Sequence, residues 1–463
     1  MCRIRQQLIM HGIYLSMNLS LSMASFSRGP RLHPLAVWPA WCRVAPRRSV
    51  IMAVALLAGL QASLSDLKPA LQAELNLVAA DHPSLALGLG WSGAGVTLGL
   101  AAGNVTLPGQ PSRPARADDR FLFGSGTKPF TAVAVLRLVE AGALSLSDLV
   151  AGHVDEVLGR ANGTSVAALY GAEAAAALTV GHLLRMQSGL PDFDTRDLDA
   201  TILADGRGVW PPYAILRAAA AQSPQLHFAP GTRTEYSSTN YVLAGLVLLA
   251  HSPQAGGDWR RLDLFSLAIP PARRAAYANL RFVNDAPISS VATVAGASSF
   301  IPGQVTPIWE QSGGVLGWTC GNMAASALDV ARFYRDLLVE GVLLRPPSVA
   351  TMQQFHLLDF GWDKGGIYYG AGLMIEQIEQ PVSNHHFAPP DFGQWGAYMG
   401  HGGDTYGFLS EQGIIGRLGN ASFSVVANTD GLYTIATRTM ACRVIAAAAK
   451  ALLSEEVDLH CEP

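Results

Sequence analysis

Lysine is scarce in this chain: only four of its 463 residues are lysine, and charged residues of all kinds make up 14%. The charge is also unevenly placed, since residues 1–65 hold seven arginines and no aspartate or glutamate. Residues 66–463 therefore carry 25 basic against 35 acidic side chains. An acidic body without a basic stripe argues against a nucleic-acid partner, because binding to phosphates depends on clustered lysine and arginine.

Cysteine is scarce too, with five in the chain, two of which lie in residues 1–65. The remaining three, Cys320, Cys442 and Cys461, form neither a CxxC pair nor a zinc-ligand spacing. An HExxH helix motif is also missing, so we expect no metal and no cofactor. The three cysteines leave two alternatives open: one disulfide with a free thiol, or buried apolar cysteines throughout.

The apolar runs are too short to span a bilayer, so we expect no stable membrane span in the mature chain. Residues 1–65 are typical of a removed targeting segment, either a signal peptide, with Arg47-Arg48 ahead of an apolar run, or an organellar transit peptide. Three N-x-S/T triplets, at Asn104, Asn162 and Asn420, favour a secreted glycoprotein. A plastid or mitochondrion is the alternative compartment.

The order of apolar patterns predicts one domain over 66–455, followed by a short tail, 456–463. Two glycine-rich strands are expected over 84–104, with a turn near Ser92-Gly93. Residues 145–300 are mainly helical and alanine-rich, and the last third is rich in strands. This pattern predicts an α/β (α+β) fold whose antiparallel sheet is built from both ends of the chain around a helical insertion.

Further elements are expected from local signals. The pattern predicts helices over 66–82, 125–141, 241–250, 327–344 and 434–454, and a hairpin turn at Gly419-Asn420.

The segment FLFGSGTKPF, residues 121–130, places Ser125 three residues before Lys128. On a helix these two side chains share one face. A buried ammonium group is costly unless it is paired or neutralised, so a lysine there needs a reason. A serine at a helix start could present its N–H to an oxyanion, and a lysine with a depressed pKa could take the seryl proton. The pair therefore indicates a nucleophile and its base.

Two further segments could complete such a site. Tyr236 lies in PGTRTEYSSTNYVLAG, just ahead of an apolar helix, and His401 lies between glycines in GHGGDTYGF. Each residue alone is typical of the core. Glycines around His401, however, indicate the close approach of another backbone or a ligand.

Together, Ser125-x-x-Lys128, Tyr236-Ser237-Ser238 and His401-Gly402-Gly403 resemble, in order and rough spacing, the motifs of the serine β-lactamase-like family. That family includes class C β-lactamases, D-alanyl-D-alanine carboxypeptidases, and related esterases and peptidases. The segments 178–193 and 312–333 are also similar to family segments, so the resemblance spans about 85–430.

The resemblance implies a β-lactamase/transpeptidase-like fold, an antiparallel sheet flanked by helices with a mainly helical insertion. It implies a serine hydrolase that forms an acyl-enzyme on a small-molecule or peptide substrate with an ester, peptide or amide bond. Ser125 would be the nucleophile, Lys128 and Tyr236 would share proton transfer, and His401 would fill a strand site that other members give to lysine.

The resemblance also implies substrate-binding groups. The backbone N–H groups of Ser125 and Asp404 would form the oxyanion hole, with Gly403 beside it. Ser238 stands where the family usually has asparagine, so its hydroxyl would contact Lys128 or a substrate amide.

Departures from the family pattern leave a second function open. Ser238 is one, Gly402 in place of a frequent threonine is another, and a third is Met186-Gln187 where histidine-threonine is common. The alternative is a weak or inactive member acting as a binding or assembly module. An α/β-hydrolase is excluded because no G-x-S-x-G elbow is present. The nearby Asp192 and Asp194 are expected to be solvated loop carboxylates.

Overall fold

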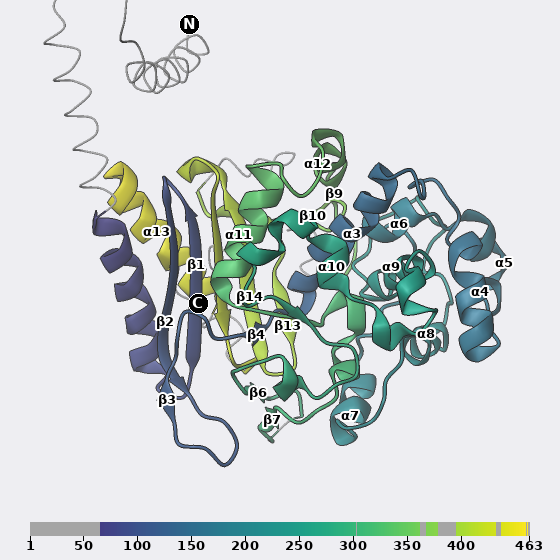
Figure 1. Ribbon diagram of the computed structural model, residues 1–463, viewed down its shortest axis with the longest axis horizontal. Helices are drawn as coiled ribbons and strands as arrows, with labels where there is room; N and C mark the ends of the chain where they lie inside the picture. The colour runs from purple at the N-terminus through teal and green to yellow at the C-terminus, as the bar shows by residue number, and fades with distance from the viewer. Residues whose placement is uncertain are drawn as a thin grey trace, which may run out of the picture. The chain divides into compact units, whose positions relative to one another are not determined.

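The computed structural model describes most of the chain beyond its arginine-rich front end (Figure 1). The described residues are 65–301, 303–361, 367–377, 395–431, 437–459 and 461. The predicted leader lies outside them except for its last residue. The leader, the compartment and the domain bounds therefore stay predictions.

The main element of the fold is a large antiparallel sheet. Its strands are β1 (Ala86–Gly93), β2 (Val96–Val105), β3 (Arg113–Pro114), β9 (His356–Leu357), β10 (Tyr368–Tyr369), β11 (Met374–Gln377), β12 (Ala397–Gly400), β13 (Gly403–Thr405), β14 (Phe408–Ile415) and β15 (Ala421–Ala427). Their order is β3-β2-β1-β15-β14-β12-β11-β10-β9, with β13 paired to β14. Since β1 pairs with β15, the two ends of the sequence meet inside one sheet, which confirms the predicted fold class.

Smaller sheets and the helices complete the described structure. The short strands are β4 (Phe121–Leu122), β5 (Arg281–Phe282), β6 (Gly296–Ser298), β7 (Thr306–Ile308) and β8 (Met323–Ala325). The helices are residues 65–81, α3 (Lys128–Glu140), α4 (Val150–Asn162), α5 (Val166–Ala177), α6 (Val180–Leu184), α7 (Arg196–Ala204), α8 (Pro212–Ala220), α9 (Thr239–Ala250), α10 (Leu264–Ala268), α11 (Ala327–Leu338), α12 (Pro346–Met352) and α13 (Thr439–Leu453).

Helices cover both faces of the sheet (Figure 1). Residues 65–81 and α13 share one apolar cluster with alternate residues of β1 and β15, such as Phe423 and Val425, whereas Val426 belongs to the core on the other face. The opposite face of β1 is built with glycine. A Cβ at Gly90 would lie 2.2 Å from the Ala327 carbonyl oxygen, so α11 rests directly on the strand. Successive side chains of a strand point to opposite faces of the sheet, so these strands contribute residues to two separate cores.

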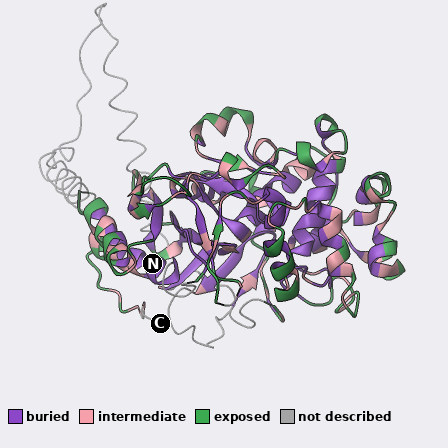
Figure 2. Ribbon diagram, turned by 90° about the horizontal axis from the view of Figure 1, so that it is seen from below, coloured by how far each residue is buried: buried purple, intermediate pink, exposed green. Residues whose placement is uncertain are grey.

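The helical part of the fold surrounds α9, which lies beside α3, α4, α6 and α8. Every residue of α9 except its last, Ala250, is buried. Figure 2 shows the buried residues gathered in the interior of the fold and the exposed ones along its outside. The prediction of a buried core helix over 241–250 is confirmed. A helix that is apolar all round needs neighbours on every side, and these four helices provide them.

One of the two predicted turns differs from the sequence-based expectation, and the other is confirmed. The β1–β2 turn falls at Ala94-Gly95, both with positive φ, and not at Ser92-Gly93. Glycine adopts a positive φ without strain, so Gly95 at the second position of the turn favours a reversal of the chain at Ala94-Gly95. The expected turn at Gly419-Asn420 is confirmed, since both residues have positive φ between β14 and β15.

The cysteines follow the first of the two open alternatives. Cys442 in α13 and Cys461 form a disulfide, while Cys320 is a buried free thiol. The disulfide ties the C-terminal segment to the last helix. In the part of the chain that the structure describes, no helix combines the length and apolarity needed to cross a membrane.

Candidate active site

Ser125 lies in a short 3-10 turn, Gly124–Thr127, that leads directly into α3. The expectation of an α-helix beginning at Ser125 is therefore wrong by one turn. In a 3-10 turn the side chains at i and i+3 eclipse one another, which brings Ser125 and Lys128 together. Gly124 has φ +48°, and a Cβ there would lie 2.3 Å from the Asp404 carbonyl oxygen. This glycine lets β13 pack against the turn.

Two side chains converge on the Ser125 hydroxyl. Lys128 Nζ lies 2.8 Å from Ser125 Oγ, and the Tyr236 hydroxyl donates to the same oxygen at 2.9 Å. Lys128 is completely buried, with its Nζ 5.0 Å from the centre of the Tyr236 ring. Its Nζ also donates to the Cys320 carbonyl at 3.4 Å. The structure thus brings together Ser125, Lys128 and Tyr236, three of the four residues predicted to be catalytic.

The protonation of this group follows from burial. Burial lowers the pKa of Lys128, although nearby acidic groups, among them Asp192 and Asp194, act in the opposite direction. Burial also raises the pKa of Tyr236 well above its ordinary value. A lysine with a lowered pKa can accept a proton from Ser125, while the protonated phenol of Tyr236 can donate a hydrogen bond.

Tyr236 is held from two sides. Its backbone N–H donates to the Phe360 carbonyl at 3.2 Å, and a Cβ on Gly361 would lie 2.9 Å from the Tyr236 Cβ. Two residues later Ser238 is the N-cap of the buried helix α9. The rigid helix therefore fixes the segment that carries the tyrosine.

Ser238 lines the cavity next to Ser125, at the position that the resemblance assigned to substrate contact. Its backbone N–H donates to Asp192 Oδ1 at 3.0 Å. The structure thus links Ser238 to a carboxylate, a contact that the sequence did not predict.

His401 differs most from its expected place. It lies in the link between β12 and β13 and not within a strand, and its side chain is completely buried. Its Nε2 is 3.1 Å from the Tyr369 hydroxyl and its Nδ1 is 2.6 Å from the Gly402 carbonyl oxygen. Burial lowers the pKa of His401 to about 3, with a smaller effect from Lys128 in the same direction. The His401 ring is therefore neutral, and its centre lies 6.2 Å from the centre of the Tyr236 ring.

Gly403 and Asp404 form the start of β13 beside the nucleophile turn. A Cβ on Gly403 would lie 2.1 Å from the Phe123 carbonyl oxygen, so only glycine fits this contact. The close packing of β13 on Gly124 brings the backbone of Asp404 next to the turn that carries Ser125. Their N–H groups as an oxyanion hole stay a prediction.

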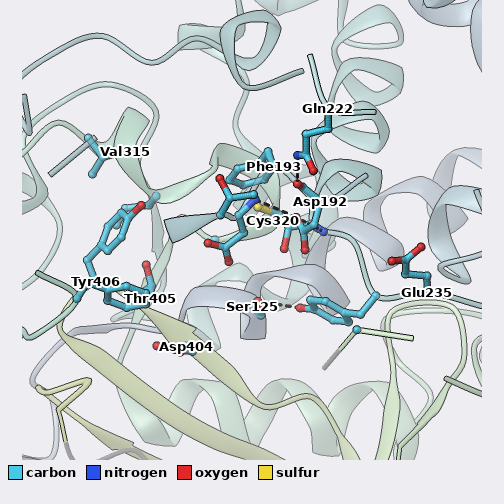
Figure 3. A pocket seen from close by; sticks show the side chains of 18 of the residues that line it. Ser125, Asp192, Phe193, Gln222, Glu235, Val315, Cys320, Asp404, Thr405 and Tyr406 are labelled. Atoms are coloured by element: carbon cyan, nitrogen blue, oxygen red, sulfur yellow. Dashed lines mark hydrogen bonds between the residues drawn. The ribbon is translucent and has the colours of Figure 1, made fainter. Parts of the chain in front are cut away.

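Ser125 opens onto a cavity of about 450 Å³ (Figure 3). The expectation of solvated loop carboxylates is wrong for Asp192, which is partly buried in its wall and accepts hydrogen bonds from the N–H groups of Ser238 and Asp194. Burial and the charge of Asp194 raise the pKa of Asp192 to about 7. The available signal was the place of Asp192 in 178–193, a segment that resembles a family segment.

Comparison with known proteins places this sequence in a family. The sequence matches the family model described as Beta-lactamase over residues 94–439, about three quarters of the chain. The chain belongs to the Beta-lactamase family. This confirms the resemblance read from the motifs, and it supports a hydrolase.

Relatives of this Beta-lactamase family chain are distant. Protein flp of Staphylococcus aureus is 31% identical over 129 residues, which is 28% of this chain and 22% of flp. Penicillin-binding protein 4 of Amycolatopsis lactamdurans is 29% identical over 268 residues, 54% of this chain and 63% of that protein. The chain thus spans about a fifth of the length of flp.

Solved structures share the fold. D-amino acid amidase from Ochrobactrum anthropi SV3, in complex with L-phenylalanine amide, superimposes with a TM-score of 0.62 at 19% identity, covering 84% of this chain and 99% of the amidase. A D-stereospecific amidohydrolase from Streptomyces sp. gives 0.59 at 22% identity, covering 79% and 96%. The β-lactamase-like fold is therefore common to this chain and both enzymes.

Proposed function

We propose that this Beta-lactamase family chain is a serine hydrolase that forms an acyl-enzyme at Ser125 on an ester, amide or peptide. The observation that carries the proposal is the double contact at the nucleophile, with Lys128 Nζ at 2.8 Å and the Tyr236 hydroxyl at 2.9 Å from Ser125 Oγ. Ser125 and Tyr236 both line a cavity that could hold a substrate.

In the proposed reaction Lys128 takes the proton of Ser125 as Oγ attacks the substrate carbonyl carbon. The resulting oxyanion accepts hydrogen bonds from the backbone N–H groups of Ser125 and Asp404. As the bond to the leaving group breaks, the proton passes through Lys128 and Tyr236 to that group. Water then attacks the acyl carbon and gives a proton to Lys128, the bond from that carbon to Ser125 Oγ breaks, and the proton returns to Oγ as the acid leaves.

His401 has a supporting part in this proposal. The buried neutral ring packs against Tyr236 and bonds to Tyr369, so it positions the tyrosine and offers no cation to a substrate carboxylate. The amidase and amidohydrolase names among the structural neighbours favour an amide or peptide bond as the target.

A fluorophosphonate probe tests the proposal, because it reacts covalently with an activated serine. The purified protein and Ser125→Ala are incubated with the probe and their intact masses compared. We expect one adduct on the wild type and none on the variant. Folded protein without an adduct would favour the alternative, a binding module, for which Ser238 in place of asparagine is the one specific observation.

A further inference from the structure

The cavity wall around Ser125 is strongly acidic. Four carboxylates line it: Asp192, Asp194, Glu235 and Asp404. Among the described residues of this wall there is no lysine and no arginine; His227 is the sole basic side chain. Its Nδ1 lies 2.8 Å from Glu235 Oε2, so His227 and Glu235 are already paired with each other. The three aspartates have no cation on the cavity wall itself, although the charge of Lys128, which is buried and does not line the cavity, acts on Asp192 and Asp194.

Asp404 carries the clearest sign of a missing partner. Its Oδ1 is buried, and within the described part of the chain no group donates a hydrogen bond to it. The carboxyl lines the Ser125 cavity and also an adjoining cavity, whose lining includes Asp199 and the exposed Arg196. A buried carboxylate oxygen without a donor is costly, which points to a donor that arrives with a ligand.

Asp194 lies close enough for its charge to act on Asp404. Burial and the charges of Asp194, Asp430 and Asp199 all raise the pKa of Asp404. Asp430 and Asp199 have donors of their own, since Ser299 donates to the first and the Tyr406 hydroxyl to the second. The mutual repulsion of Asp194 and Asp404 would be relieved by a cation bound between them.

Aromatic and aliphatic side chains line other parts of the same cavity: Phe193, Phe300, Val315, Leu316 and Tyr406. In the view of Figure 3, Val315 and Tyr406 are drawn on one side of Ser125, and Asp192 above it. A ligand that fits such a cavity combines a positive group with an apolar one.

We propose that the substrate carries an ammonium group near the carbonyl that Ser125 attacks, bound by Asp404 and Asp194, together with an apolar side group. The inference rests on the proposed function and names its substrate class. It also disfavours a substrate carboxylate at this wall, because the carboxylates would repel it and His401 supplies no charge.

Binding tests the recognition apart from any chemistry. Calorimetry with benzylammonium and with the neutral benzyl alcohol measures the preference for charge in the wild type, Asp404→Asn and Asp194→Asn. We expect the wild type to prefer the ammonium by at least about tenfold, and each variant to lose most of that preference. Glu173→Gln removes an exposed carboxylate on α5 and should leave the preference unchanged.

Equal affinities for the two ligands would overturn the inference. So would a preference that survives in both aspartate variants. Because Asp404 packs against the nucleophile turn and its variant could fail to fold, thermal unfolding is recorded for each protein. If Asp404→Asn does not fold, the Asp194→Asn variant, which changes an exposed residue, decides the test of the ammonium site alone.

Hydrolysis separates this inference from the proposed function. Three nitroanilides with the same leaving group are compared: alanyl, which is cationic, propionyl, which is neutral, and succinyl, which is anionic. We expect kcat/KM to fall in that order. If the fluorophosphonate probe labels Ser125 but the propionyl or succinyl compound is hydrolysed faster than the alanyl compound, the ammonium site is contradicted and the proposed hydrolase function still stands. No labelling and no turnover would contradict the hydrolase, and the calorimetry would still decide the ammonium site.

Discussion

Replacement of Tyr236 by phenylalanine is the most direct perturbation of the proposed proton transfer. It removes one hydroxyl, which lies 2.9 Å from Ser125 Oγ, and keeps the ring that packs on His401 and near Lys128. A positioned acid or base contributes about 10²–10⁴ in rate, so we expect kcat/KM to fall by at least about 10². The stability cost should stay near 1 kcal/mol, because Ser125 keeps its contact with Lys128.

The assay compares initial rates on a nitrophenyl ester with thermal unfolding. Tyr170→Phe is the matched control, since this buried tyrosine donates to the Leu216 carbonyl at 3.0 Å, far from Ser125 in the helical part of the fold. We expect that variant to lose a similar amount of stability with little change in rate. A Tyr236→Phe enzyme within about threefold of the wild type would refute the assigned role.

Four further results are expected. Lys128→Met should abolish turnover without loss of thermal stability, since it replaces a desolvated amine with an apolar side chain; rates and unfolding midpoints check this. Because the folded pKa of His401 is about 3 against about 6.5 when unfolded, it lowers stability as pH falls through that window, and His401→Asn should flatten this acid limb in unfolding curves recorded from pH 7 to 4. Gly124→Ala should lower both the unfolding midpoint and the rate, since its positive φ and the contact with β13 leave no room for a methyl group. Cys461→Ser, which opens the disulfide to Cys442, should cost about 3 kcal/mol and leave the rate unchanged, as measured by denaturant unfolding and turnover.

The sequence predicted those parts of the fold that follow from a strong local period. The helix α9 is apolar all round, and the amphipathic pattern of α11 matches its burial against the sheet. The turn at Gly419-Asn420 was visible because both residues tolerate positive φ. The pairing of β1 with β15 was expected only from the order of elements, since register depends on contacts between distant segments.

The site was predicted in part for the same reason. Ser125 and Lys128 are neighbours in one turn, so their contact follows from local geometry. The orientation of His401 toward Tyr369 depends on packing between strands, which residue order does not encode. The acidic wall was missed because Asp192 and Asp404 are more than two hundred residues apart in the sequence and meet only in the folded cavity.

The central claim is that Ser125 becomes acylated during turnover. The most direct measurement quenches the enzyme in acid during the pre-steady-state phase with a nitrophenyl ester, followed by intact-mass analysis and mapping of the modified peptide. The account predicts one acyl group on the peptide that contains Ser125, formed with a burst of nitrophenol and absent from Ser125→Ala. Turnover with no acylated peptide, or an acyl group on another residue, would contradict it.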